Sequence, residues 1–181
     1  MNESNDQVRP ATRILKRVVA AALAQQKPSY HGTEPRALLL LESDCSGLPV
    51  ALIEDNILEP LDKLIWLVLM VRACRSDGLT SMPTHKELAE SVNVASRQAA
   101  SRSLLILRCR RWLTVCHTSW RKGGKRRGSA FAMHVAPMPI ADTIYLDPRY
   151  VSFLKDLTGQ HQGRVGSVAS AIFGQISHQS V

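Results

Sequence analysis

Apolar side chains recur along the chain with two periods, about three to four residues in some stretches and two in others. The longer period is typical of helices with one buried face, and the alternation is typical of strands. Helical spacing predicts helices over 8–26, 60–72 and 164–176, and helices that open at Thr84, Ser96 and Asp147. Alternation and short apolar runs predict strands over 37–41, 79–82, 112–119 and 129–135, whereas 50–57 stays ambiguous. The pattern indicates an α+β fold, mainly α with a small β-hairpin.

The helix predicted from Pro60 to Arg72 is apolar on nearly all sides. Its apolar positions are Leu61, Leu64, Ile65, Trp66, Leu67, Val68, Leu69, Met70 and Val71. A helix of this composition is usually buried on several sides. We therefore expect it to be the first helix of the domain and to lie beneath the two helices that follow.

Two capped helices joined by a tight turn come next. Thr84 is the expected cap of the first helix, and Glu87 three residues later completes a capping box. Ser96 is the expected cap of the second helix, and Asn93 tolerates the left-handed backbone needed at the end of the first. A connection of about three or four residues between two helices is typical of a helix-turn-helix.

The helix that opens at Ser96 is polar and basic on one side of its first two turns. Its apolar positions, Ala100, Leu104 and Leu107, are expected to face the core. The opposite side carries Arg97, Gln98, Ser101 and Arg102. Arginine pairs with guanine and glutamine with adenine in the major groove, which a recognition helix reaches with its N-terminal turns. This face predicts contact with DNA bases, although a solvated helix face would also be polar.

A glycine-centred basic loop joins the last two predicted strands. Gly123 and Gly124 supply a turn between them. The basic residues around this turn are Arg121, Lys122, Lys125, Arg126 and Arg127. The loop is where a winged helix-turn-helix has its wing, and its charges suit phosphates or the minor groove. A solvated loop or a nuclear-localisation patch would have a similar composition.

The positive charge of the chain is concentrated in one stretch. The formal net charge is +8, and residues 91–141 contain ten Lys or Arg and no Asp or Glu. The rest of the chain therefore carries a net charge of −2. A pI near 9.7 favours an anionic partner, either nucleic acid or an anionic membrane surface.

The sequence contains no motif that indicates an enzyme, a metal site or a cofactor. The four cysteines (45, 74, 109 and 116) form no CxxC pair, and their scatter suits a reducing cytosol. Neither a nucleophile elbow nor an HExxH motif is present, and the basic stretch has no carboxylates for a nuclease. We therefore expect no catalytic residues, no metal ligands and no cofactor.

No apolar run reaches the roughly 20 residues that a membrane span needs. The basic amphipathic segment 8–26 leaves two interpretations, a helix on a membrane surface and a helix that docks on the domain or on a second subunit. Its apolar side is rich in alanine and lacks bulky anchors, which favours docking.

Several blocks of the chain, in order and spacing, resemble the helix-turn-helix replication proteins of pathogenicity islands and integrative conjugative elements. The blocks are residues 35–41, 58–63 with Trp66, 79–84, Arg102 with Leu104, 107–113 and 144–150. The resemblance spans roughly residues 35–150. It implies a winged helix-turn-helix and a role in the replication of a mobile element or in the transcriptional control of that replication.

The sequence therefore predicts a winged helix-turn-helix over 35–140, preceded by an N-terminal helix and linker over 1–34 and followed by a helical extension over 141–181. We expect sequence-specific binding of double-stranded DNA by Ser96, by the polar face that follows it and by the basic loop. Thr84 and Lys86 are expected to contact phosphate at a helix N-terminus. The terminal helices are candidates for a homodimer contact, and the expected location is the bacterial nucleoid in the cytoplasm. The alternative is a non-catalytic protein-interaction module of a replication or partition complex.

Overall fold

The computed structural model of the 181-residue chain describes residues 8–25, 36–40, 47–76, 78–120, 126–160 and 163–179. Of residues 22–25, 117–120, 126–128 and 179 it describes the backbone alone. The described helices are α1 (Pro10–Gln25), α2 (Val50–Glu54), α3 (Pro60–Cys74), α4 (His85–Ser91), α5 (Arg97–Cys109), α6 (Ile140–Leu146), α7 (Tyr150–Gln160) and α8 (Arg164–Gln179). The described strands are β1 (Arg36–Leu40), β2 (Leu79–Ser81), β3 (Leu113–Trp120) and β4 (Arg126–Met133). The α+β class expected from the sequence is confirmed.

The strands form one sheet in the order β2-β1-β4-β3. β3 and β4 are the antiparallel hairpin that the alternating pattern predicts. β1 lies between β4, to which it is parallel, and β2, to which it is antiparallel. Ala37, Leu38 and Leu39 are buried, as a central strand covered on both faces requires. The sequence predicts this strand, but it does not predict its place at the centre of the sheet.

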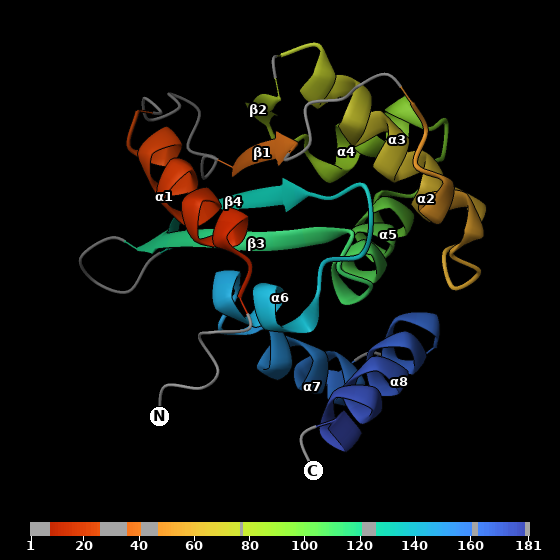
Figure 1. Ribbon diagram of the computed structural model, residues 1–181. Coiled ribbons are helices and arrows are strands. Elements are labelled where there is room, and N and C mark those ends of the chain that lie inside the picture. The colour runs from red at the N-terminus through yellow and green to blue at the C-terminus, as the bar shows by residue number, and fades with distance from the viewer. Residues whose placement is uncertain are drawn as a thin grey trace.

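Helices cover both faces of the sheet (Figure 1). Leu38, Phe131 and Met133 belong to the main hydrophobic cluster, which also holds the buried side chains of α3, α4, α5, α7 and α8. The alternate residues Ala37, Leu39, Ala130 and Ala132 face a second cluster formed with α1 and with the segment around α6. Successive residues of β4 therefore point to opposite faces of the sheet, with the small side chains on the α1 face and the large ones in the main core.

The helix α3 is anchored by its N-terminus but is not buried on all sides. Glu59 and Asp62 form a capping box, and Ile65, Trp66 and Leu69 are fully buried against the sheet and α5. On the opposite side, however, Leu64 and Val71 are each 42% exposed. The expectation that an apolar composition buries this helix on several sides is therefore wrong for its outer face.

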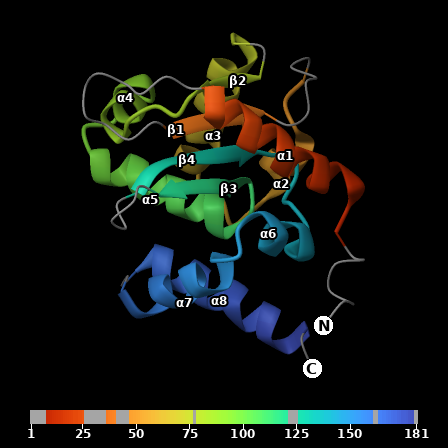
Figure 2. The same ribbon diagram turned by 90° about the vertical axis from the view of Figure 1, so that its left-hand side faces the viewer.

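The two ends of the chain pack on the middle of it. Leu15 and Val19 of α1 are buried against the sheet, so α1 docks on the domain, whereas Ile14 and Val18, which the helical spacing places on its apolar side, are 62% and 51% exposed. The packed structure continues past the expected boundary at residue 140, because α6 begins at Ile140 and shares the cluster of α1. The following helix, α7, starts at Tyr150 rather than at Asp147. The pair α7 and α8 then packs beneath α5 (Figure 2).

The cysteines fall into two groups. Cys109 and Cys116 are free and buried, and burial raises the pKa of each thiol to about 12. Cys74, at the end of α3, is disulfide-bonded. A disulfide at Cys74 does not fit the expectation that the scattered cysteines suit a reducing cytosol.

Candidate nucleic-acid interface

The start of α4 has the capping box that the sequence predicts. The Thr84 Oγ1 accepts the N–H of Glu87 at 3.2 Å, and the Glu87 carboxylate accepts the N–H and the hydroxyl of Thr84 at 2.7 and 2.9 Å. The hydrogen bonds from Thr84 lower the pKa of Glu87, which favours the ionised carboxylate. A phosphate at this position would have to compete with that carboxylate, so the geometry gives Thr84 a structural role.

Lys86 is the accessible cation of α4. Its side chain is 62% exposed, and its Nζ lies 3.7 Å from Glu90 Oε1 one turn later. An exposed ion pair of this kind contributes little stability, so it is readily exchanged for another anion. Lys86 therefore remains a candidate phosphate contact.

The turn between α4 and α5 has the expected conformation. Asn93 takes the left-handed conformation with φ 53°. Ser96 then caps α5, and its Oγ accepts the N–H of Ala99 at 3.2 Å. The Ser96 hydroxyl is thus engaged in holding the first turn of α5 in place.

The first two turns of α5 present the polar face that the sequence predicts. Ala100, Leu104 and Leu107 are buried in the main core. Arg97, Gln98 and Arg102 are exposed, and Ser101 is half-buried. At 3.6 residues per turn, the two arginines flank Gln98 and Ser101 on one side of the helix. Within the part of the chain that the structure describes, Arg97 and Arg102 form no ion pair with an acidic group.

The arginines at the end of α5 have acidic partners, unlike those at its start. Arg108 Nη2 donates to Asp147 Oδ2 at 2.6 Å, and its guanidinium lies 3.7 Å from the centre of the Phe153 ring. Arg110 Nε and Nη2 donate to Asp55 Oδ2 at 3.1 and 2.9 Å. These two members of the basic stretch therefore hold α5 to α7 and to the segment after α2.

Asp55 is the anchor of the turn from α5 into β3. Its Oδ2 also accepts the indole N–H of Trp112 at 2.9 Å, and the ring of Trp112 packs edge-on against Trp66 with the ring centres 6.0 Å apart. Burial alone would raise the pKa of Asp55. The hydrogen bonds from Trp112 and Arg110 outweigh this effect, so the pKa of Asp55 is below its usual value. Asp55 is therefore an ionised, buried acceptor.

The hairpin residues expected to form a wing lie largely outside the described part of the chain. Arg121, Lys122 and Lys125 are outside it, and Arg126 and Arg127 are described only as the first backbone positions of β4. β3 and β4 remain paired up to Trp120 and Arg126. Figure 1 shows this paired end of the hairpin on the left of the molecule, beside α1, whereas α4 and α5 lie on the right.

A cavity of about 370 Å³ lies beside Arg102 and Ser103, and the sequence gives no sign of it. It is lined by residues from the starts of α3 and α8 as well as by α5. Arg164 is one of the lining residues, with Nε 2.9 Å from Glu59 Oε1 and Nη2 2.5 Å from Asp62 Oδ2. The residues that meet here are about a hundred positions apart, so no local spacing could have brought them together.

The described residues contain no group of three or more His, Cys, Asp or Glu side chains placed to hold a metal ion. His134 is buried, and its Nε2 lies 3.0 Å from Thr114 Oγ1. Burial lowers the pKa of His134 to about 3, with the charge of Arg9 acting in the same direction. His134 is therefore a neutral core residue.

Comparisons of the chain with known protein families, with curated proteins and with solved structures give no match. Among the helices that the structure describes, none has both the length and the apolar composition to cross a bilayer.

Proposed function

We propose that the chain is a winged helix-turn-helix protein that binds double-stranded DNA sequence-specifically. The order α3-β2-α4-α5-β3-β4 along the chain is that of a winged helix with α5 in the place of the recognition helix, and β1 is inserted in the sheet between β2 and β4. The observation that carries the proposal is the exposed face of the first two turns of α5. Its arginines have no acidic partner among the described residues, whereas the far end of the helix is fixed in the core.

In this proposal Arg97, Gln98, Ser101 and Arg102 contact base edges in the major groove. Lys86 contacts a backbone phosphate, and the basic loop around Gly123 contacts backbone or minor groove. The role in replication of a mobile element, or in the transcriptional control of that replication, rests on the resemblance of the sequence blocks.

Selection of duplexes from a randomised pool by the full chain tests the proposal. We expect the pool to converge on one sequence, and the pool selected by an Arg97→Ala, Gln98→Ala variant to lose that preference. Arg17→Ala is a matched control, because Arg17 is an exposed arginine of α1 on the opposite side of the molecule. A pool that stays random with the wild-type chain would contradict base reading by α5.

A further inference from the structure

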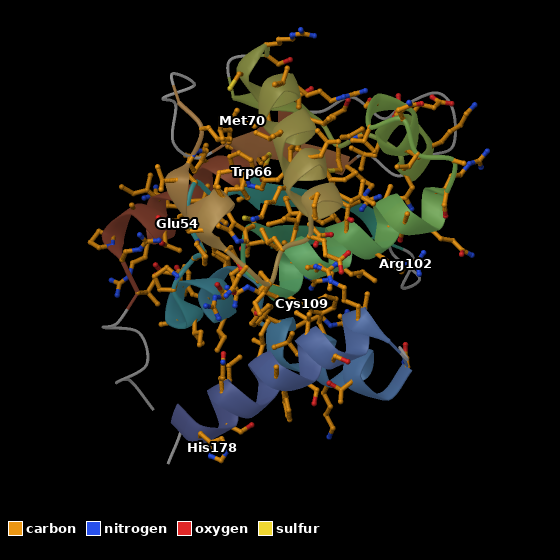
Figure 3. The ribbon with its side chains drawn as sticks, turned by 90° about the vertical axis from the view of Figure 1, so that its right-hand side faces the viewer. Glu54, Trp66, Met70, Arg102, Cys109 and His178 are labelled. Atoms are coloured by element: carbon orange, nitrogen blue, oxygen red, sulfur yellow. The ribbon has the colours of Figure 1, made fainter. Side chains whose placement is uncertain are left out.

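The cavity of about 370 Å³ beside Arg102 lies where three helices begin. Figure 3 shows α5 between α3 above it and the pair α7 and α8 below it, with Arg102 in the first two turns of α5. A cavity of this size is within the range of small-molecule sites in proteins. Its lining residues are Glu59 and Leu61 of α3 and its cap, Ala99, Arg102 and Ser103 of α5, and Gly163, Arg164 and Val165 at the start of α8.

The hydroxyl of Ser103 is a buried polar group in the wall of this cavity. Ser103 is 3% exposed, and its hydroxyl forms no hydrogen bond with the described residues. By contrast, the helical serines Ser91, Ser167 and Ser177 each donate to a carbonyl oxygen four residues earlier. Because a buried hydroxyl without a hydrogen bond costs stability, a molecule that enters the cavity gains by supplying the missing partner.

Three apolar side chains line the same cavity. Val165 is 3% exposed, and Leu61 and Ala99 are half-buried. Contact with these side chains removes an apolar body from water, which favours binding. The wall therefore suits a small organic molecule better than an inorganic ion.

The formal charges around the cavity cancel. Arg164 is paired with both Glu59 and the buried Asp62, so these three side chains together carry one negative charge. Arg102 balances it, because it is exposed and has no acidic partner among the described residues. Lys63, the next charged residue of α3, is not a lining residue and donates to a carbonyl oxygen of α2 instead.

The backbone adds positive potential to this balance. α5 and α8 both begin at the cavity, and neither has an acidic residue in its first turn. Gly163, which precedes α8, has no side chain to cap the first N–H groups of that helix. The start of a helix carries about half a positive charge, so the two helices together favour a ligand with one negative charge.

We propose that this cavity binds a small organic carboxylate with a short apolar body. The carboxylate accepts hydrogen bonds from Arg102, from the Ser103 hydroxyl and from the first N–H groups of α8, and the body contacts Leu61 and Val165. The consequence for DNA rests on the proposed function, in which Arg102 contacts a base. Since one guanidinium cannot serve both partners, the carboxylate and DNA compete, and each lowers the affinity for the other.

Titration of the isotope-labelled full chain with benzoate, followed by NMR, tests the site without DNA. We expect the amide signals of Ala99, Ser103 and Val165 to shift, with a dissociation constant on the order of a millimolar for so small a molecule. Benzamide, which has the same ring but no charge, should bind at least about tenfold more weakly. The absence of shifts at these amides, or equal affinity for the two molecules, overturns the proposal.

Substitutions in α5 test which side chains hold the carboxylate. Ser103→Ala and Arg102→Ala should each weaken benzoate binding about tenfold. Arg97→Ala is the matched control, because Arg97 is an exposed arginine of the same helix that does not line the cavity, and benzoate binding should be unchanged. Alanine is the best helix former, so Ser103→Ala should keep the fold, which the same spectra report. A Ser103→Ala variant with the affinity of the wild type overturns the assignment of the hydroxyl.

The competition is measured by fluorescence anisotropy with the duplex that the wild type selects. Benzoate at about ten times its dissociation constant should weaken DNA binding about tenfold in the wild type and about twofold in Ser103→Ala, relative to sodium chloride at the same ionic strength. An unchanged affinity of the wild type for DNA contradicts the competition. A chain that binds benzoate as expected but binds no duplex would contradict the proposed function and leave this site in place.

Discussion

The two halves of α5 contain the same kind of residue in two different situations. In the first half, Arg97 and Arg102 are exposed and have no acidic partner among the described residues. In the second half, Arg108 is held by Asp147, and Arg110, the C-cap residue directly after α5, is held by Asp55. The basic stretch of the sequence therefore overstates the charge that is available to a ligand. One end of the helix is fixed in the protein, and the other is free to contact a partner.

The largest loss of stability is expected when the anchored end of α5 loses its acidic partner. Asp55→Ala leaves Arg110 and the indole N–H of Trp112 without their acceptor. We expect a loss of about 3 kcal/mol in the free energy of unfolding, because one partner of a buried pair is removed. Urea unfolding measures the loss, and Glu54→Ala, at the exposed neighbouring position, should change stability by less than about 0.5 kcal/mol. Equal effects of the two substitutions would contradict the anchoring role of Asp55.

The stability that Asp55 contributes at the end of α5 should also depend on pH. The pKa of Asp55 in the folded chain is lowered, so its contribution is complete above the unfolded pKa of about 3.9 and is lost as pH falls through the folded pKa. The stability difference between the wild type and Asp55→Asn should therefore be constant from about pH 7 to 5 and shrink below about pH 4. Urea unfolding at several pH values measures it. A difference that grows as pH falls would show that Asp55 is protonated in the folded chain.

A smaller effect is expected at the start of the free half. Ser96→Ala removes the acceptor for the Ala99 N–H and should cost about 1 kcal/mol of stability. Thermal unfolding measures this cost, and Ser170→Ala, at an exposed position of α8, is the control. If the two serine substitutions have the same effect, the cap does not hold the start of α5.

The smallest expected effect is a change in the salt dependence of DNA binding when Lys86, in α4, is replaced. Lys86→Ala should lower the slope of log affinity for duplex DNA against log salt by about one and weaken all sequences alike. Lys155→Ala, an exposed lysine on α7, should leave the slope unchanged. An unchanged slope in Lys86→Ala would remove this residue from the phosphate contacts.

The sequence predicts the local parts of this arrangement well. The Thr84 and Ser96 caps, the left-handed Asn93 and the buried positions of α5 depend on residues within a few positions of one another, and all are confirmed. The partners of Arg108 and Arg110 are 39 and 55 residues away, so no local pattern indicates them.

The same limit applies to two features of the core. The parallel pairing of β1 with β4 joins residues about ninety positions apart, and an apolar strand can occupy several places in a sheet. Apolar composition places α3 in the core, but it does not distinguish packing against this chain from packing against another. The exposed Leu64 and Val71 are apparent only in the structure.

The binding of duplex DNA by an Arg97→Ala, Arg102→Ala variant tests the contrast between the two halves most directly. Fluorescence anisotropy at constant salt, with the duplex selected by the wild type, measures the affinity, and thermal unfolding of the same samples measures stability. We predict an affinity at least about thirtyfold lower with unchanged stability, because in the proposed complex both arginines contact bases and neither forms an ion pair within the described fold. An affinity equal to that of the wild type would contradict the account, and so would a loss of stability as large as that of Asp55→Ala.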